Sequence, residues 1–132
     1  MAVIVLAEDE LHIAQVVSLW LAKNQHVVHK AYNGRDALEL VRQHRPDLLI
    51  TDVNMPVMDG IDLITACGAE GLPRVGTIML TSRCDQTEIQ EALKGLDVVL
   101  HPKPFSPSKL TNEVRQLLAR SQSDLTRVNE SG

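Results

Sequence analysis

Residues 46–60 of this 132-residue chain are PDLLITDVNMPVMDG. The run LLI at 48–50 is apolar without interruption, which indicates a strand buried on both faces. Strands of this kind belong to parallel sheets that helices cover on both sides. The acidic side chain of Asp52 follows closely, so a carboxylate is expected at the end of a buried strand.

The pattern of this stretch repeats along the chain. Short apolar runs alternate five times with longer segments of helical periodicity, which predicts an α/β fold with a five-stranded parallel sheet between two helix layers. The expected strands are Val3–Ala7, His26–Lys30, Leu48–Thr51, Thr77–Thr81 and Val98–Leu100. The expected helices are Leu11–Lys23, a second around Ala37–Val41 that ends before Pro46, Asp59–Ala69, Thr87–Leu93 and Pro107–Arg120.

The composition bounds the class of protein. The length suits one domain with one core. Thirteen basic and seventeen acidic side chains give a formal net charge of −4, and the chain has one Trp, one Tyr and one Phe. Direct nucleic-acid binding therefore does not fit, because it usually needs a basic face or aromatic stacking platforms. No apolar segment approaches the roughly 18 residues of a membrane helix, so we expect a cytoplasmic protein without membrane contact.

The last twelve residues, SQSDLTRVNESG at 121–132, are polar and lack the apolar period of the preceding helix. We expect a domain over residues 1–120 and, after it, a polar tail or the start of a linker to an output domain.

Chemistry-bearing residues follow the expected strands. Glu8 and Asp9 come after the first strand, Asp52 after the third, Thr81 ends the fourth, and Lys103 follows the fifth. Parallel strands place their carboxyl ends along one edge, where open α/β sheets bind ligands. Two carboxylates about 4 Å apart at an effective dielectric of about 20 repel by about 4 kcal/mol. The cluster therefore predicts a divalent cation among the acids.

Mg²⁺ suits this set of ligands, because it prefers oxygen and is typically held by one or two carboxylates plus phosphate oxygens. Asp9 and Asp52 could supply the carboxylates, with Glu8 acting through water and the Asn54 backbone oxygen completing the site. Asp52 could also be a nucleophile that forms an aspartyl phosphate. Lys103 would then neutralise a phosphoryl oxygen, and Thr81 would donate a hydrogen bond to another.

Four separated motifs carry a family resemblance. EDE at 8–10, DVNMPVMDG at 52–60, LTS at 80–82 and KPF at 103–105 resemble, over residues 1–120, the receiver domains of two-component response regulators. The resemblance implies a flavodoxin-like doubly wound sheet with strand order 2-1-3-4-5. It also implies a Mg²⁺-dependent phosphoryl transfer to Asp52 from a sensor histidine kinase or a histidine phosphotransfer protein.

The same resemblance implies roles for individual residues. Asp9 would bind Mg²⁺ directly, Glu8 mostly indirectly, and Asn54 through its backbone oxygen. Thr81 and Lys103 would contact the phosphoryl group, and the Lys103–Pro104 bond would be cis. Gly60 would let the chain turn sharply into the third helix. The output would be a changed protein-binding surface, read by a downstream domain or protein, or a phosphorylation-dependent homodimer.

The chain departs from the family pattern at three places: Glu8, the segment at 98–103, and Arg83. Glu8 stands where many members have Asp, a substitution that the family often shows. One additional residue lies between Gly95 and Lys103. Leu100 stands where many members have an aromatic residue that swings inward with the threonine. Arg83 occupies a position that, together with Asn54, tunes the lifetime of the phosphoryl group across the family.

Two other functions share parts of this chemistry. A phosphohydrolase with an aspartyl nucleophile would need the same carboxylate, cation and lysine, but enzymes of the haloacid-dehalogenase type usually carry a DxD pair and a cap domain, which this sequence lacks. The other is a degenerate receiver that serves as an unphosphorylated scaffold. The complete set of acids argues against such a scaffold. We expect a receiver that promotes its own phosphorylation and dephosphorylation without being a turnover enzyme.

Overall fold

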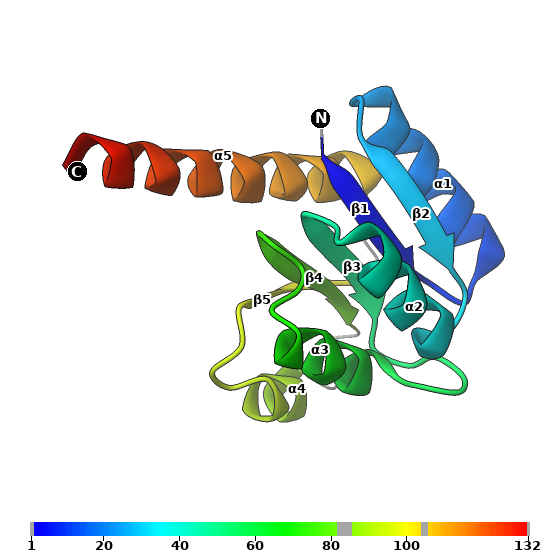
Figure 1. The fold of residues 1–132 in the computed structure, drawn as a ribbon. Helices are drawn as coiled ribbons and strands as arrows, with labels where there is room; N and C mark the ends of the chain where they lie inside the picture. The colour runs from blue at the N-terminus through cyan, green and yellow to red at the C-terminus, as the bar shows by residue number, and fades with distance from the viewer. Residues whose placement is uncertain (1, 82–85, 104–105, 132) are drawn as a thin grey trace.

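The structure is a computed structural model that describes residues 2–81, 86–103 and 106–131 (Figure 1). Five strands alternate with five helices along the chain. The elements are β1 (Val3–Ala7), α1 (Leu11–Lys23), β2 (Val27–Ala31), α2 (Gly34–His44), β3 (Leu48–Asp52), α3 (Gly60–Ala69), β4 (Gly76–Thr81), α4 (Gln86–Ala92), β5 (Val98–Pro102) and α5 (Pro107–Ser131).

All strands are parallel and lie in the order β2-β1-β3-β4-β5, which confirms the expected topology. The three central strands come from the most apolar runs, and every residue of β3 and β4 is buried. Because β1 and β3 are neighbours, Ala7 pairs with Thr51, and the residues after each strand emerge side by side.

Helices cover both faces of the sheet, so the molecule has three layers. Alternate residues of the central strands point to opposite faces, as the pleat requires. Val5 and Leu49 join a core cluster with α2, α3 and α4, whereas Ile4 and Ile50 join a second cluster with α1 and α5. Figure 1 shows α2, α3 and α4 on the near side of the sheet.

The predicted elements are all present, with small shifts at their ends. The bounds of β1 and α1 agree with the prediction. The second strand begins one residue later, β3 extends to Asp52, β4 begins one residue earlier, and β5 extends to Pro102. Helix boundaries move by the same small amounts in α3 and α4, a scatter that end fraying makes normal.

The prediction that the last helix ends at Arg120 was wrong, because α5 continues to Ser131. Residues 121–131 contain neither Gly nor Pro, so nothing in the sequence forces the helix to stop. The apolar residues spaced along α5, among them Leu110, Val114 and Leu117, mark only the part of the helix that packs on the sheet. Figure 1 shows the remaining turns projecting away from it.

None of the described helices combines the length and the apolar character that a bilayer span requires. Arg83 and the Lys103–Pro104 bond, for which the sequence raised expectations, lie outside the described residues.

We expect residues 121–132 to contribute little to stability, because their sequence lacks the apolar period of residues 107–120, where Leu110, Val114 and Leu117 are buried in the core. Removing them should change the free energy of unfolding by less than about 0.5 kcal/mol. Leu110→Ala should cost about 2–5 kcal/mol, since Leu110 is 1% exposed in the core. Urea unfolding followed by circular dichroism measures both. A large loss on truncation would place the helix extension within the domain.

Candidate functional site

Three acidic side chains meet at the carboxyl edge of the sheet. Glu8 and Asp9 follow β1, and Asp52 ends β3, its neighbour in the sheet. One carboxylate oxygen from each residue lies within 4.8 Å of the others. The convergence expected from the strand ends is therefore present.

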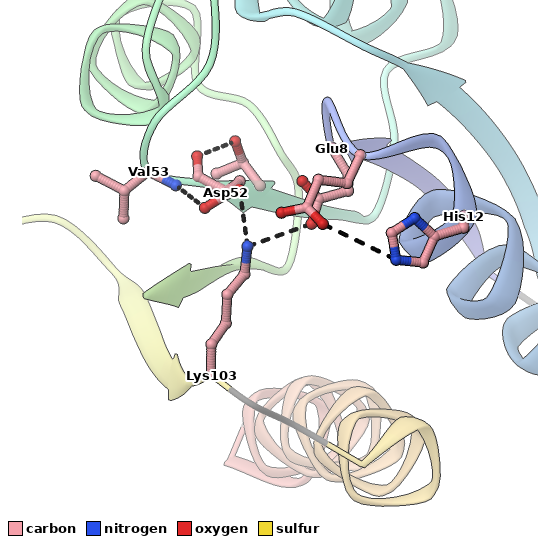
Figure 2. Close-up of polar contacts among 7 residues, drawn as sticks. Glu8, His12, Asp52, Val53 and Lys103 are labelled. Carbon is pink, nitrogen blue, oxygen red and sulfur yellow. Dashed lines mark hydrogen bonds and ion pairs between the residues drawn. The ribbon is translucent and has the colours of Figure 1, made fainter. Parts of the chain in front are cut away.

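Lys103 approaches this cluster from the end of β5 (Figure 2). Its Nζ donates a hydrogen bond to Asp52 Oδ2 at 2.8 Å and another to Glu8 Oε1 at 3.4 Å. Partial burial lowers the pKa of the ammonium, but the hydrogen bond and charge of Asp52, with those of Glu8, more than offset this and raise the pKa overall. Lys103 is therefore held in its charged form.

Glu8 is the least solvated member of the cluster. Its side chain is completely buried, and its Oε2 has no hydrogen-bond partner among the described residues. Burial and the charge of Asp52 raise the pKa of Glu8 to about 7, against the opposing effect of Lys103. A buried carboxylate without full pairing favours its neutral form, unless a further positive charge arrives.

The residues fit a hard divalent cation. Their donor atoms are all oxygens, one of them is buried and unpartnered, and three carboxylates share one ammonium within the described chain. Mg²⁺ prefers such ligands and would supply the missing positive charge. Asn54 lies two residues beyond Asp52, in the exposed loop between β3 and α3.

The carboxylate of Asp52 is oriented from within its own segment. Asp52 Oδ1 accepts a hydrogen bond from the backbone N–H of Val53 at 2.7 Å, and the backbone carbonyl of Asp52 accepts one from the Thr51 hydroxyl at 2.9 Å. The side chain remains 12% exposed. The nucleophile proposed from the sequence is therefore held in a defined orientation and can still be reached from outside.

Gly60 closes the base of the loop that follows Asp52. A Cβ on Gly60 would lie 2.1 Å from the Asp52 backbone oxygen, and the Gly60 N–H donates to the Val53 carbonyl at 2.7 Å. Gly60 has no positive φ. The glycine is therefore required by a close approach of two backbones, rather than by the sharp turn that the sequence suggested.

Thr81 and β5 form the remaining side of the site. Thr81 is 1% exposed at the end of β4, and its carbonyl accepts a hydrogen bond from the Lys103 N–H at 2.7 Å. Strands β4 and β5 pair without interruption from Thr77 with Val98 to Thr81 with Pro102. The additional residue noted before Lys103 is thus absorbed ahead of β5. Leu100 is half-buried on the sheet face that α2, α3 and α4 cover.

A cavity of about 430 Å³ opens beside the acidic cluster, and sequence reasoning did not find it. Its walls come from α1 and the start of α5, and it reaches Lys103; the lining residues are Glu10, His12, Ile13, Val16, Val17, Lys103 and Pro107. The sequence feature that could have indicated this cavity is the composition of α1, which carries apolar residues on almost every side. Leu11, Val16, Leu19 and Trp20 are exposed as a result.

Comparison with known proteins agrees with the fold and the site. The family model described as "Response regulator receiver domain" matches residues 4–115. The receiver domain of the Francisella response regulator 1452 superposes with a TM-score of 0.82 at 26% identity, covering 92% of this chain and 99% of that one. The chemotaxis response regulator CheY4 of Vibrio cholerae gives a TM-score of 0.79 at 31% identity, covering 89% and 98%. The chain belongs to the family of response regulator receiver domains of two-component systems.

Among curated proteins, a similar relative is the "Transcriptional regulatory protein SrrA" of Staphylococcus aureus. It is 30% identical over 128 residues, which are 96% of this chain but 52% of the relative. The chain thus spans about half the length of the curated relatives that it resembles.

The raised pKa of Glu8 predicts an unusual pH dependence in the metal-free protein. Folded chains keep a proton on Glu8 up to a pH of about 7, whereas its ordinary pKa of 4.5 applies after unfolding. Because the folded chain binds this proton more tightly than the unfolded chain, the proton stabilises the fold. The stabilisation is fully present below the unfolded pKa and is lost as the pH rises through 7. The free energy of unfolding in urea should therefore fall between about pH 5 and 8.

Glu8→Gln should abolish this fall, since it removes the titrating group. Adding MgCl₂ to the wild type at the upper end of the range should restore stability, because ligand binding to the folded state shifts the unfolding equilibrium. Parallel pH profiles of the wild type and Glu8→Gln would contradict the role given to Glu8.

Proposed function

We propose that this chain is a phosphorylation-activated switch, in which Asp52 accepts a phosphoryl group from a partner histidine kinase or histidine phosphotransfer protein. One observation carries the proposal: an oriented and reachable aspartate lies among two further carboxylates and a charged lysine. Phosphoryl transfer depends mostly on positioning and on neutralising charge, and this site can do both.

In the proposed transfer, an oxygen of the Asp52 carboxylate attacks the phosphorus atom of a phosphohistidine. A P–O bond forms, the P–N bond breaks, and the imidazole leaves with the electron pair and takes up a proton. Val53 fixes the orientation of the nucleophile through its N–H. Lys103 already lies 2.8 Å from Asp52 and would neutralise a phosphoryl oxygen, while Thr81 would donate a hydrogen bond to another.

Mg²⁺, when bound, would neutralise both the acids and the phosphoryl oxygens, and it fits the donor set described above. We assign Asp9 and Asp52 as direct ligands, Glu8 as a ligand through water, and Asn54 as a ligand through its backbone oxygen. The buried Oε2 of Glu8 supports this assignment, since it has no hydrogen-bond partner among the described residues.

The switch would follow from the new charge at Asp52. A phosphoryl group adds about −1.5 to −2 charges and strong acceptors, which can bias a two-state element. Thr81 ends β4, and β5 pairs with β4 along its whole length. We therefore place the output surface on α4, β5 and α5. Leu100 replaces the usual aromatic on β5, so the change would be transmitted without a ring that swings inward.

The phosphoryl donor would dock on α1. A donor histidine must reach Asp52, so the donor covers the surface that surrounds this residue during transfer. The apolar cavity, which the half-exposed side chain of Val16 helps to line, reaches Lys103 on that surface. Because the curated relatives are about twice as long and one is a transcriptional regulator, we propose a downstream output domain or protein as the second partner.

The central test replaces the proposed nucleophile. Wild-type protein incubated with Mg²⁺ and acetyl phosphate should gain one phosphoryl group by intact mass, and Asp52→Asn should gain none. Asp62→Asn, which removes an exposed acid from α3, should behave as the wild type. Equal modification of the wild type and Asp52→Asn would end the assignment, and steady turnover of a phosphate ester would favour a phosphohydrolase instead.

The docking surface can be tested separately from the chemistry. Val16→Glu should slow phosphoryl transfer from a phosphorylated kinase at least tenfold, because it buries a charge in the apolar contact. Its reaction with acetyl phosphate should stay within twofold of the wild type. Gln15→Glu adds the same charge one residue earlier on the helix, outside the cavity lining, and should be neutral. Equal loss with both donors would refute docking on α1.

A further inference from the structure

The loop between β3 and α3 has a strained conformation at its outer end. The Met58 N–H donates to the Pro56 carbonyl at 2.8 Å, which closes a three-residue turn around Val57. Val57 has a φ of 71° although it is β-branched, a combination that is rare and costly. Its side chain is 75% exposed, so burial does not offset the cost. Another contact must hold the loop in this shape.

That contact comes from the first residue of α2. A Cβ on Gly34 would lie 2.1 Å from the Met58 carbonyl oxygen and 2.8 Å from both the carbonyl carbon and the Cβ of Met58. Gly34 is buried, and the preceding Asn33 caps the helix by accepting a hydrogen bond from the Asp36 N–H at 2.8 Å. The backbone at the start of α2 is therefore a fixed support on which the backbone of the loop rests.

The loop is thus held at two places. At its base, Gly60 packs against the Asp52 carbonyl and donates to Val53, as described above. At its outer end, Met58 rests on Gly34. Asn54 lies between these two contacts, and in both of them only a glycine leaves room for the opposing carbonyl.

We propose that Gly34 is a positioning residue for the loop that carries Asp52 and Asn54, and that it acts by holding Met58 in place. This inference rests on the proposed function, because the loop matters chiefly if it binds Mg²⁺ and accepts the phosphoryl group. An added methyl group at residue 34 has to displace the Met58 backbone, because a carbonyl cannot rotate away as a side chain can. The displacement passes along the loop to the oxygen of Asn54.

Gly34→Ala tests the proposal in the 132-residue chain. A titration with MgCl₂, followed by the backbone amide resonances of Val53 and Asn54, should show a dissociation constant at least fivefold weaker than that of the wild type. In the metal-free protein, hydrogen exchange of the Gly60 amide should become at least tenfold faster, since the base of the loop opens with its outer end. Gly68→Ala is the matched control, because its Cβ would meet only Leu96 Cδ2 at 3.8 Å.

A second comparison covers the case in which Gly34→Ala alone does not fold. Val57→Gly relieves the strain in the turn. When the two substitutions are combined, the loop can therefore move away from the methyl group that Gly34→Ala adds. The double variant should fold and bind Mg²⁺ at least fivefold more weakly than Val57→Gly alone. Equal affinity in that pair, or affinity of Gly34→Ala within twofold of the wild type, would overturn the positioning role. Failure of the wild type to bind Mg²⁺ would instead overturn the proposed function.

Discussion

The structure depends on one electrostatic constraint, the confinement of three carboxylates at the edge of a sheet where one ammonium balances them within the described chain. Lys103 pairs with Asp52 and Glu8 but cannot neutralise the whole cluster. Glu8 responds by holding its proton up to a pH of about 7. An added positive charge would stabilise this cluster of acids. The site therefore suits a divalent cation and the phosphoryl chemistry that such a cation assists.

The rest of the fold keeps the carboxylates from moving apart. The two strands that deliver them are hydrogen-bonded neighbours in the centre of the sheet and are packed on both faces. The loop after Asp52 is braced by backbone contacts at Gly60 and Gly34, where no side chain could fit. Backbone contacts of this kind are stiffer than contacts between side chains, so repulsion among the acids cannot easily be relieved by moving the loop.

Two regions of the molecule divide the work in the function that we propose. The cavity lined mainly by α1 lies beside the site and suits contact with a donor. The surface of α4, β5 and α5 suits an output, since β5 pairs with β4, which ends at Thr81. The chain spans about half the length of its curated relatives, and the C-terminal part of α5 projects away from the sheet.

The sequence by itself determined the sheet, its helices and the identity of the clustered residues. The elements could be predicted because hydrophobic periodicity is a local pattern. Residues that follow parallel strands share one edge of the sheet, so the clustered residues could be predicted as well; they are Glu8, Asp9, Asp52, Thr81 and Lys103. The end of α5 could not be predicted, because an apolar stripe marks packing rather than the length of a helix. Only the tertiary structure decided the burial of Glu8, the bridging position of Lys103, the exposure of α1 and the contact of Gly34 with Met58. Each of these depends on how segments distant in sequence approach one another, and no local pattern records those distances.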